Sequence, residues 1–263
     1  MGAPQKICFL KYFIFQLLLV LLFLTGCTSL EFSRSPGKYH PKLPDLHDVK
    51  IAFVLGGGGA KGIAHVGVLE ELSREGIHPD LIVGCSAGAI VGALYADNPD
   101  VHRLKKLLME KKREHLLDIS LRYLPYGISK GYALQQFLTD NLEAKTFEQL
   151  KIPFVSVATS LEFGDLVLFG TGPLEPAVRA SAAFPGVFHP VRINGHYFVD
   201  GGVVNITPVE VAKRLGAEFV NAIELDNQLS DSPPNHLIGI IKRCLEISLS
   251  HQGRHATKEA DFV

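Results

Sequence analysis

Cysteine is scarce in this sequence, with four residues in a chain of 263. Cys8 and Cys27 lie near the N-terminus, whereas Cys85 and Cys244 are far apart along the chain. A disulfide would require the fold to bring the Cα atoms of Cys85 and Cys244 within about 7 Å of each other. Cys85 lies inside a tight glycine-containing motif, so we expect both to be free, small, apolar core residues. The sequence therefore lacks a disulfide framework.

An excess of charge of one sign is also missing, because 26 basic residues face 27 acidic ones. This balance argues against a nucleic-acid-binding protein, which needs a surplus of positive charge. No cluster of histidine, cysteine and aspartate has the spacing of metal ligands, and no aspartate-rich calcium loop is present. We therefore expect no metal and no cofactor. Internal repeats and low-complexity segments are absent as well, and the length suits one sizeable α/β core or two small domains.

The N-terminal segment has the pattern of a secretory signal. Lys6 and Lys11 accompany a nearly unbroken apolar run over residues 12–24. This run is shorter than the roughly 20 residues of a membrane-spanning helix. Residues 1–26 are therefore predicted to be a signal peptide that is absent from the mature protein.

The signal ends in Leu24-Thr25-Gly26-Cys27, which resembles the bacterial lipobox. The resemblance implies cleavage before Cys27, a diacylglycerol on its sulfur and a further acyl chain such as palmitate on its new amine, a combination that anchors firmly to a membrane. Thr28 stands where an aspartate would favour the inner membrane, so we expect a lipid-anchored envelope protein, in the outer membrane if the organism has one. The alternative is an ordinary secretory signal in which Cys27 is incidental.

Residues 27–48 are predicted to be the lipidated cysteine and a tether, since they contain three prolines and no hydrophobic period. The folded domain is expected over residues 49–263. In its first part, apolar runs typical of strands at 51–55 and 81–84 alternate with helical patterns at 62–75 and 86–96. Buried strands separated by helices predict a mostly parallel, doubly wound α/β sheet with helices on both faces. Further helices are expected at 101–117, 132–142, 208–215 and 237–249, and further strands at 154–159, 166–169, 191–193, 197–199 and 219–225.

A glycine-rich loop, Gly56-Gly57-Gly58-Gly59-Ala60-Lys61-Gly62, lies where the first strand becomes the first helix. Its backbone N–H groups can point at a negative charge. Gly57, Gly59 and Gly62 also satisfy the dinucleotide-binding pattern, which requires an acidic residue about 20 residues further on, after the second strand. No acidic residue stands there, and the glycine after Lys61 excludes a Walker A loop. A nucleotide-binding protein is therefore a weaker alternative.

The segment after the second strand is Gly84-Cys85-Ser86-Ala87-Gly88, a GxSxG nucleophile elbow in a strand-turn-helix context. The glycines permit the sharp turn that presents the Ser86 hydroxyl. The Ala87 N–H at the helix N-terminus can join the glycine loop in stabilising an oxyanion.

A third motif, Asp200-Gly201-Gly202, follows a hairpin whose turn is Asn194-Gly195. An aspartate before two glycines is by itself a common turn. Together, however, the three motifs in this order resemble the patatin-like phospholipases over residues 51–225. The segment Pro173-Leu174-Glu175-Pro176-Ala177-Val178-Arg179-Ala180-Ser181-Ala182-Ala183-Phe184-Pro185-Gly186-Val187-Phe188 also looks like the family's segment between elbow and aspartate.

The resemblance implies an enzyme that hydrolyses acyl esters, with phospholipids as the expected substrates and no cofactor. It implies that Ser86 is the nucleophile and Asp200 its base, and that Gly57, Gly58 and Gly59 supply oxyanion donors with Ala87. Lys61, Gly62, Gly84, Gly88, Gly201 and Gly202 would support these motifs. A lysophospholipase or neutral-lipid esterase of the same mechanism is a near alternative, and an inactive lipoprotein serving as an interaction module is a distant one.

Three histidines lie near the motifs and offer an alternative base. His65 belongs to the first helix and is expected to be packed, and His196 begins a strand, while His189 precedes the hairpin. A catalytic triad is defined by geometry that a sequence does not contain. The interpretation favoured here is a Ser86/Asp200 dyad without histidine.

Overall fold

The computed structural model describes residues 37–110, 116–120, 123–124, 126–225 and 234–263, together with residues 30 and 32. The chain divides into two compact units, Met1–Phe32 and Ser33–Val263. The predicted signal peptide and Cys27 lie outside the described residues. Among the described residues, no helix is both long enough and apolar enough to cross a membrane.

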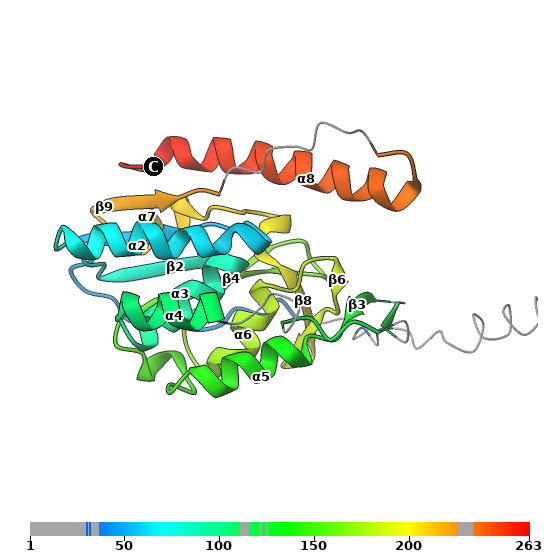
Figure 1. Ribbon diagram of the computed structural model, residues 1–263, viewed down its shortest axis with the longest axis horizontal. Helices are drawn as coiled ribbons and strands as arrows, with labels where there is room; N and C mark the ends of the chain where they lie inside the picture. Colours follow the sequence, from blue (N-terminus) through cyan, green and yellow to red (C-terminus); the bar gives the residue numbers. More distant parts are fainter. Residues whose placement is uncertain are drawn as a thin grey trace, which may run out of the picture. The chain divides into compact units, whose positions relative to one another are not determined.

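The second unit is an α/β domain (Figure 1). Its strands are β1 (Ile51–Leu55), β2 (Leu81–Cys85), β3 (Gly127–Ser129), β4 (Phe154–Ser160), β5 (Leu166–Phe169), β6 (Gly186–Phe188), β7 (Val191–Ile193), β8 (His196–Asp200) and β9 (Phe219–Ile223). Its helices are α2 (Ala64–Arg74), α3 (Ala87–Asp97), α4 (Val101–Glu110), α5 (Tyr132–Asn141), α6 (Leu174–Ser181), α7 (Val209–Arg214) and α8 (Leu237–Ala256), and its short 3-10 turns include η1 (Gly59–Ile63) and η5 (Gly201–Val203).

Seven strands form one sheet in the order β7-β8-β4-β2-β1-β9, with β5 paired to β4. The four strands β4, β2, β1 and β9 are parallel, as expected for strands connected through helices. The strands β5, β8 and β7 join antiparallel. The prediction of a mostly parallel sheet is therefore confirmed, and β3 and β6 form a separate small sheet.

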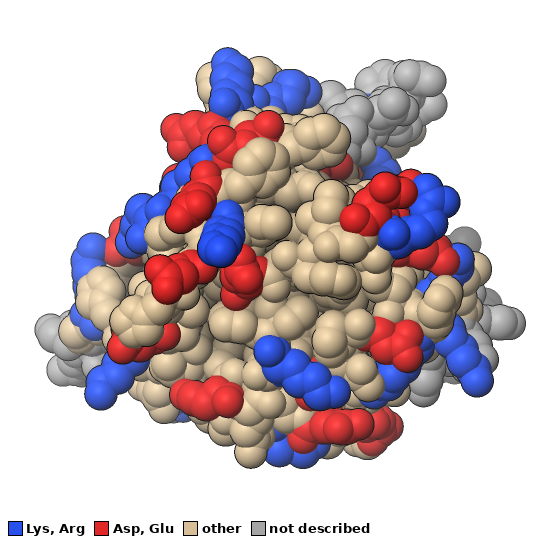
Figure 2. Space-filling model, turned by 90° about the vertical axis from the view of Figure 1, so that its left-hand side faces the viewer, with Lys and Arg blue, Asp and Glu red and all other residues tan. Residues whose placement is uncertain are grey.

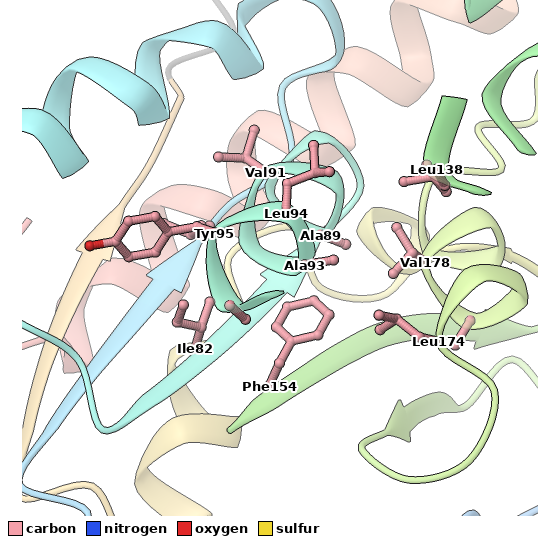
Figure 3. Close-up of a cluster of buried hydrophobic side chains, with 14 of the residues drawn as sticks. Ile82, Ala89, Val91, Ala93, Leu94, Tyr95, Leu138, Phe154, Leu174 and Val178 are labelled. Atoms are coloured by element: carbon pink, nitrogen blue, oxygen red, sulfur yellow. The ribbon is translucent and has the colours of Figure 1, made fainter. Parts of the chain in front are cut away.

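Helices cover both faces of this sheet and bury an apolar core on each. On one face, α3 is buried along nearly its whole length, because its small residues let it lie close to β1 and β2. Figure 3 shows Tyr95 and Leu94 of this helix with Ile82 and Phe154 of the sheet, and Leu174 and Val178 of α6 on the neighbouring side. The opposite face of the parallel strands packs against α7.

The expected hairpin is present, and its two turn residues have the positive φ angles that the sequence predicts, 51° at Asn194 and 88° at Gly195. Helix α8 continues to Ala256, seven residues beyond the predicted end. Helix α4 is described as far as Glu110, and residue 117 is not helical. Helix α6 and strands β3 and β6 were not predicted, because α6 contains Pro176 within its first turn and the two strands have only three residues each.

The segment before β1, which we expected to be part of a tether, contacts the domain from residue 38 onward. The Lys38 ammonium pairs with Asp165 at 2.5 Å. The Tyr39 ring stacks on His196 with centroids 5.6 Å apart, and the Lys42 carbonyl accepts a hydrogen bond from Thr171. These contacts hold the segment against β5 and β8.

Charged side chains of both signs are interspersed on the face shown in Figure 2, with uncharged residues between them. Salt bridges such as Lys105–Glu70 and Lys213–Asp261 join residues on different elements of the fold. Cys85 and Cys244 are both free, as expected, although Cys244 is exposed instead of buried. No group of metal-ligating side chains occurs among the described residues.

Candidate active site

Ser86 lies at the sharp turn between β2 and α3, with φ 54° and ψ −122°. A non-glycine residue at positive φ is strained, and such strain persists only where the surroundings enforce it. The two flanking glycines, Gly84 and Gly88, make the turn possible because neighbouring backbone atoms lie where a side chain would be. A Cβ atom at Gly88 would lie 2.0 Å from the Leu55 carbonyl oxygen, and one at Gly84 would lie 2.7 Å from the Ala89 Cα.

Ser181 accepts a hydrogen bond from the backbone of this strained turn. The Ser86 N–H donates to the Ser181 Oγ at 2.9 Å, and Ser181 is fully buried at the end of α6. Without this acceptor, the Ser86 N–H would lose its hydrogen-bond partner within the protein. Ser181 is therefore a positioning residue of the elbow. Sequence reasoning did not assign it this role, because α6 was not predicted and the contact spans 95 residues.

Asp200 reaches Ser86 because two strands share one edge of β4. Residues 156–157 of β4 pair with β2 and β5, and residues 158–159 pair with β8 and β5. Strand β5 therefore occupies one edge of β4, while β2 and β8 follow one another along the other. Cys85 pairs with Val157, and Asp200 pairs with Ala158, the next residue. The end of β8 thus lies directly beside the end of β2.

The two predicted site residues are in direct contact. The Ser86 Oγ donates to the Asp200 Oδ2 at 2.6 Å. The other carboxylate oxygen, Oδ1, accepts from the Gly202 N–H at 2.8 Å and from the Cys85 thiol at 3.9 Å. These partners orient the carboxylate so that Oδ2 faces the serine.

Asp200 is 2% exposed, and its burial raises the pKa of the carboxyl from 3.8 to about 6, against the hydrogen bonds from Ser86, Gly202 and Cys85, which lower it. A carboxylate with a raised pKa is a stronger base than an exposed aspartate. It is still ionised at neutral pH. Burial also raises the pKa of the Cys85 thiol well above its ordinary value, so the thiol stays protonated and can donate.

The glycine loop lies beside Ser86, and the four expected oxyanion donors, three in the loop and Ala87 in α3, differ in their surroundings. The Gly57 N–H donates to the Ile206 carbonyl at 2.9 Å, so in this structure it holds the loop and does not face a substrate. Gly58 is the N-cap of η1, Gly59 is its first residue, and Ala87 is the first residue of α3. Their N–H groups therefore belong to helix starts that lack intrahelical acceptors. Gly59 has φ 54°, which glycine adopts readily.

The remaining glycines of the motifs are required by close packing. A Cβ at Gly62 would lie 2.6 Å from the Ala87 Cβ, which would separate the glycine loop from the start of α3. A Cβ at Gly201 would lie 2.5 Å from the Val157 carbonyl oxygen. Lys61 is exposed on η1.

The His65 ring contacts the backbone of the glycine loop and is not hydrogen-bonded to Ser86 or Asp200. Its Nε2 lies 2.8 Å from the Gly56 carbonyl oxygen, which can only accept, so Nε2 carries the proton. Its Nδ1 is buried without a hydrogen-bond partner. His189 bonds to the Tyr123 carbonyl, and His196 stacks on Tyr39. Within the described part of the chain, no histidine is hydrogen-bonded to Ser86 or Asp200.

Asp200 and His65 predict opposite effects of pH on folding. The pKa of Asp200 is higher in the folded than in the unfolded protein, so its contribution to the free energy of unfolding depends on pH. This contribution is complete below about pH 4 and is lost as the pH rises through about 6. Burial lowers the pKa of His65 from 6.5 to about 4, so its contribution is complete above pH 6.5 and is lost as the pH falls toward 4. Each shift corresponds to about 3 kcal/mol.

We expect Asp200→Asn to gain stability relative to the parent as the pH rises from 4 to 7, and His65→Gln to gain it as the pH falls over the same range. The free energy of unfolding, measured with urea at several pH values, checks both. Because each variant is compared with the parent at the same pH, contributions of other groups cancel. Parallel curves for the parent and both variants would contradict the burial of these two groups.

Known proteins are similar to this chain in sequence. A family model described as patatin-like phospholipase matches residues 53–213. Patatin-like phospholipase domain-containing protein 6 of Mus musculus is 34% identical over 184 residues, which are 68% of this chain and 14% of the mouse protein. An uncharacterized NTE family protein of Mycobacterium bovis is 34% identical over 192 residues, which are 71% of this chain and 53% of that protein. The chain thus matches about half or less of the length of these relatives.

Two bacterial proteins are among the solved structures that match part of this chain. VipD from Legionella pneumophila has a TM-score of 0.47 at 18% identity, covering 62% of this chain and 47% of VipD. ExoU from Pseudomonas aeruginosa has a TM-score of 0.41 at 19% identity, covering 84% of this chain and 53% of ExoU.

Proposed function

Since the chain belongs to the patatin-like phospholipase family, we propose that it is a lipid ester hydrolase that cleaves acyl esters of phospholipids with a Ser86/Asp200 dyad. The observation that carries the proposal is the 2.6 Å hydrogen bond from the Ser86 Oγ to the Asp200 Oδ2. This bond joins a nucleophile at a strained elbow to a buried carboxylate whose pKa is raised to about 6.

The proposed reaction begins with attack of the Ser86 Oγ on the ester carbonyl carbon while its proton moves to the Asp200 Oδ2. The tetrahedral intermediate collapses, the carbon–oxygen bond to the alcohol breaks, and the alcohol leaves with the proton from Asp200. Water then attacks the acyl-enzyme and gives its proton to Asp200. Collapse of the second intermediate returns a proton to the Ser86 Oγ and releases the fatty acid.

Charge on the tetrahedral oxygen requires donors that are in place before the reaction. We propose the N–H groups of Gly58, Gly59 and Ala87 for this role. The Gly57 N–H has the Ile206 carbonyl as its acceptor, which supports a structural role for this residue. The positive end of the α3 dipole at Ala87 favours the same anion.

We also propose that the protein is anchored to the bacterial envelope through a lipidated Cys27. The support is the sequence Leu24-Thr25-Gly26-Cys27 after the apolar run. A lipid anchor would keep the domain near its substrate. Lysophospholipids and neutral lipid esters remain candidates for the same chemistry.

Product analysis on defined lipids tests the substrate class. The purified protein is incubated with a diacyl phospholipid, the matching lysophospholipid and a triacylglycerol of the same chain length, and products are identified by mass spectrometry. We expect fatty acid and lysophospholipid from the first substrate, at a rate that Ser86→Ala abolishes. Release of fatty acid from the lysophospholipid or triacylglycerol alone would replace the proposed substrate with that one.

A further inference from the structure

Helix α8 has one face on the domain and one face in solvent. Leu249, Ser250 and Gly253 are buried on the inner face. The opposite side of the first three turns is apolar and exposed, which is unusual for a helix that packs on a core through its other side. We call this set the outer face of α8; it consists of Leu237, Ile240, Ile241, Cys244 and Ile247.

The exposure of the outer face is large. Leu237 is 72% exposed and Ile241 is 60% exposed, and these residues lie one turn apart on the same side of the helix. Large apolar side chains that are grouped in this way mark a binding surface more often than scattered ones do.

The exposed ionisable residues of α8 near the outer face are basic ones. In the last turns of α8, the exposed residues that continue the same side include His251, Arg254 and His255. Glu246, the acidic residue of the helix, is partly buried and pairs with Lys242. Among the α8 residues whose exposure the structure describes, none of the exposed ones is acidic. An apolar stripe with basic residues beside it is typical of a helix that lies in a membrane interface.

The helix also adjoins the active-site loop. The Gln252 side chain donates to the Val203 carbonyl of η5 at 3.3 Å, and Leu249 and Gly253 of α8 pack close to Gly202 and Ile206 respectively. Val204, which follows η5, is itself 36% exposed. The inner face of α8 therefore packs on the loop that carries Asp200, and an object bound to the outer face would lie across the helix from this loop.

We propose that the outer face of α8 docks the domain onto a lipid bilayer that contains anionic phospholipids. The proposal rests on the proposed function, because the substrate of that function is itself part of such a surface. The hydrocarbon region accepts the apolar side chains, and the phosphate groups attract the neighbouring basic ones. A second copy of the chain bound to the outer face would explain its apolar residues. It would not explain why none of the exposed α8 residues described by the structure is acidic.

The absence of tryptophan from the sequence makes a direct test possible. Ile241→Trp places a single fluorophore on the outer face of α8. The matched control is Phe219→Trp, because Phe219 is 44% exposed at the first residue of β9, at the end of the sheet away from Ser86. Both full-length variants have the same N-terminal segment, so a difference between them reports the position of the fluorophore and not an anchor.

With vesicles of phosphatidylcholine and phosphatidylglycerol, we expect the emission of Ile241→Trp to shift to shorter wavelength and to be quenched by phospholipids brominated on their acyl chains. The emission of Phe219→Trp should not change. Equal responses of the two variants would overturn the proposal. A shift of Ile241→Trp without vesicles that grows with protein concentration, together with a doubled mass in light scattering, would assign the face to a second copy and would also overturn it.

A kinetic comparison separates docking from catalysis. We expect Leu237→Gln combined with Ile241→Gln to lower the rate on vesicle phospholipid by about tenfold or more, since two apolar side chains no longer leave water. The rate on a soluble short-chain ester should stay within about twofold of the parent. An unchanged vesicle rate would overturn the docking role. If the parent itself hydrolysed no ester, the proposed function would fail, while the fluorescence result would still decide the docking.

Discussion

Ser86→Ala and Asp200→Asn are each expected to lower kcat by a factor on the order of 10⁴ or more. The first removes the atom that attacks the ester, and the second removes the acceptor 2.6 Å from it. Because the two groups act in one proton transfer, the double variant should be no slower than the slower single variant. Rates on a soluble ester, with folding checked by circular dichroism, provide the measurement.

Three controls keep this result specific. Cys85→Ala changes a buried neighbour of Asp200 but removes only a weak donor 3.9 Å away, so it should retain activity within about tenfold of the parent. His65→Gln and His189→Gln should stay in the same range, because neither ring is bonded to the dyad. A fluorophosphonate should label Ser86. Full activity in folded Ser86→Ala, or near-complete loss in a folded histidine variant, would disprove the dyad.

Gly58→Ala is expected to lower kcat by about 100-fold with little change in KM, because it displaces oxyanion donors that act in the transition state. The structure gives a direct cause for this loss of turnover. The cause is steric contact, because an added Cβ would lie 2.5 Å from the Leu225 Cδ1 and 2.8 Å from its Cβ. The loop must move away from Leu225 to make room.

This cause can be tested by a compensating change. Leu225→Gly removes both obstructing atoms, Cδ1 and Cβ, so the double variant with Gly58→Ala should regain most of the lost turnover, while Leu225→Gly alone should lower the turnover of the folded protein little. Gly67→Ala is the matched control, because a Cβ there meets nothing within 4 Å and the position is an exposed one in α2. A Gly58→Ala variant as active as its parent, or a double variant as slow as the single one, would show that this contact does not position the donors.

The unpredicted parts of the fold are those in which local signals were weak. Helix α6 begins with Leu174 and includes Pro176 in its first turn. Proline is compatible with a first helical turn, but in a sequence it is also typical of a loop. The alanines of α6 give no strong apolar period. Strands β3 and β6 have three residues each, which is too short for an alternating pattern. The contact between Ser181 and the Ser86 N–H was not predicted either, because Ser181 lies at the end of α6.

The sequence by itself determined the local parts of this protein, namely the alternation of strands and helices, the elbow at Ser86, the glycine loop and the Asn194-Gly195 turn before Asp200. Each depends on backbone angles and apolar spacing within a few residues. The tertiary structure alone decided that β2 and β8 share one edge of β4, which places Ser86 and Asp200 together across 114 residues. It also decided the roles of Ile206 and Ser181 as acceptors and the raised pKa of Asp200. Pairing of distant strands and burial depend on the whole chain, so no local pattern contains them.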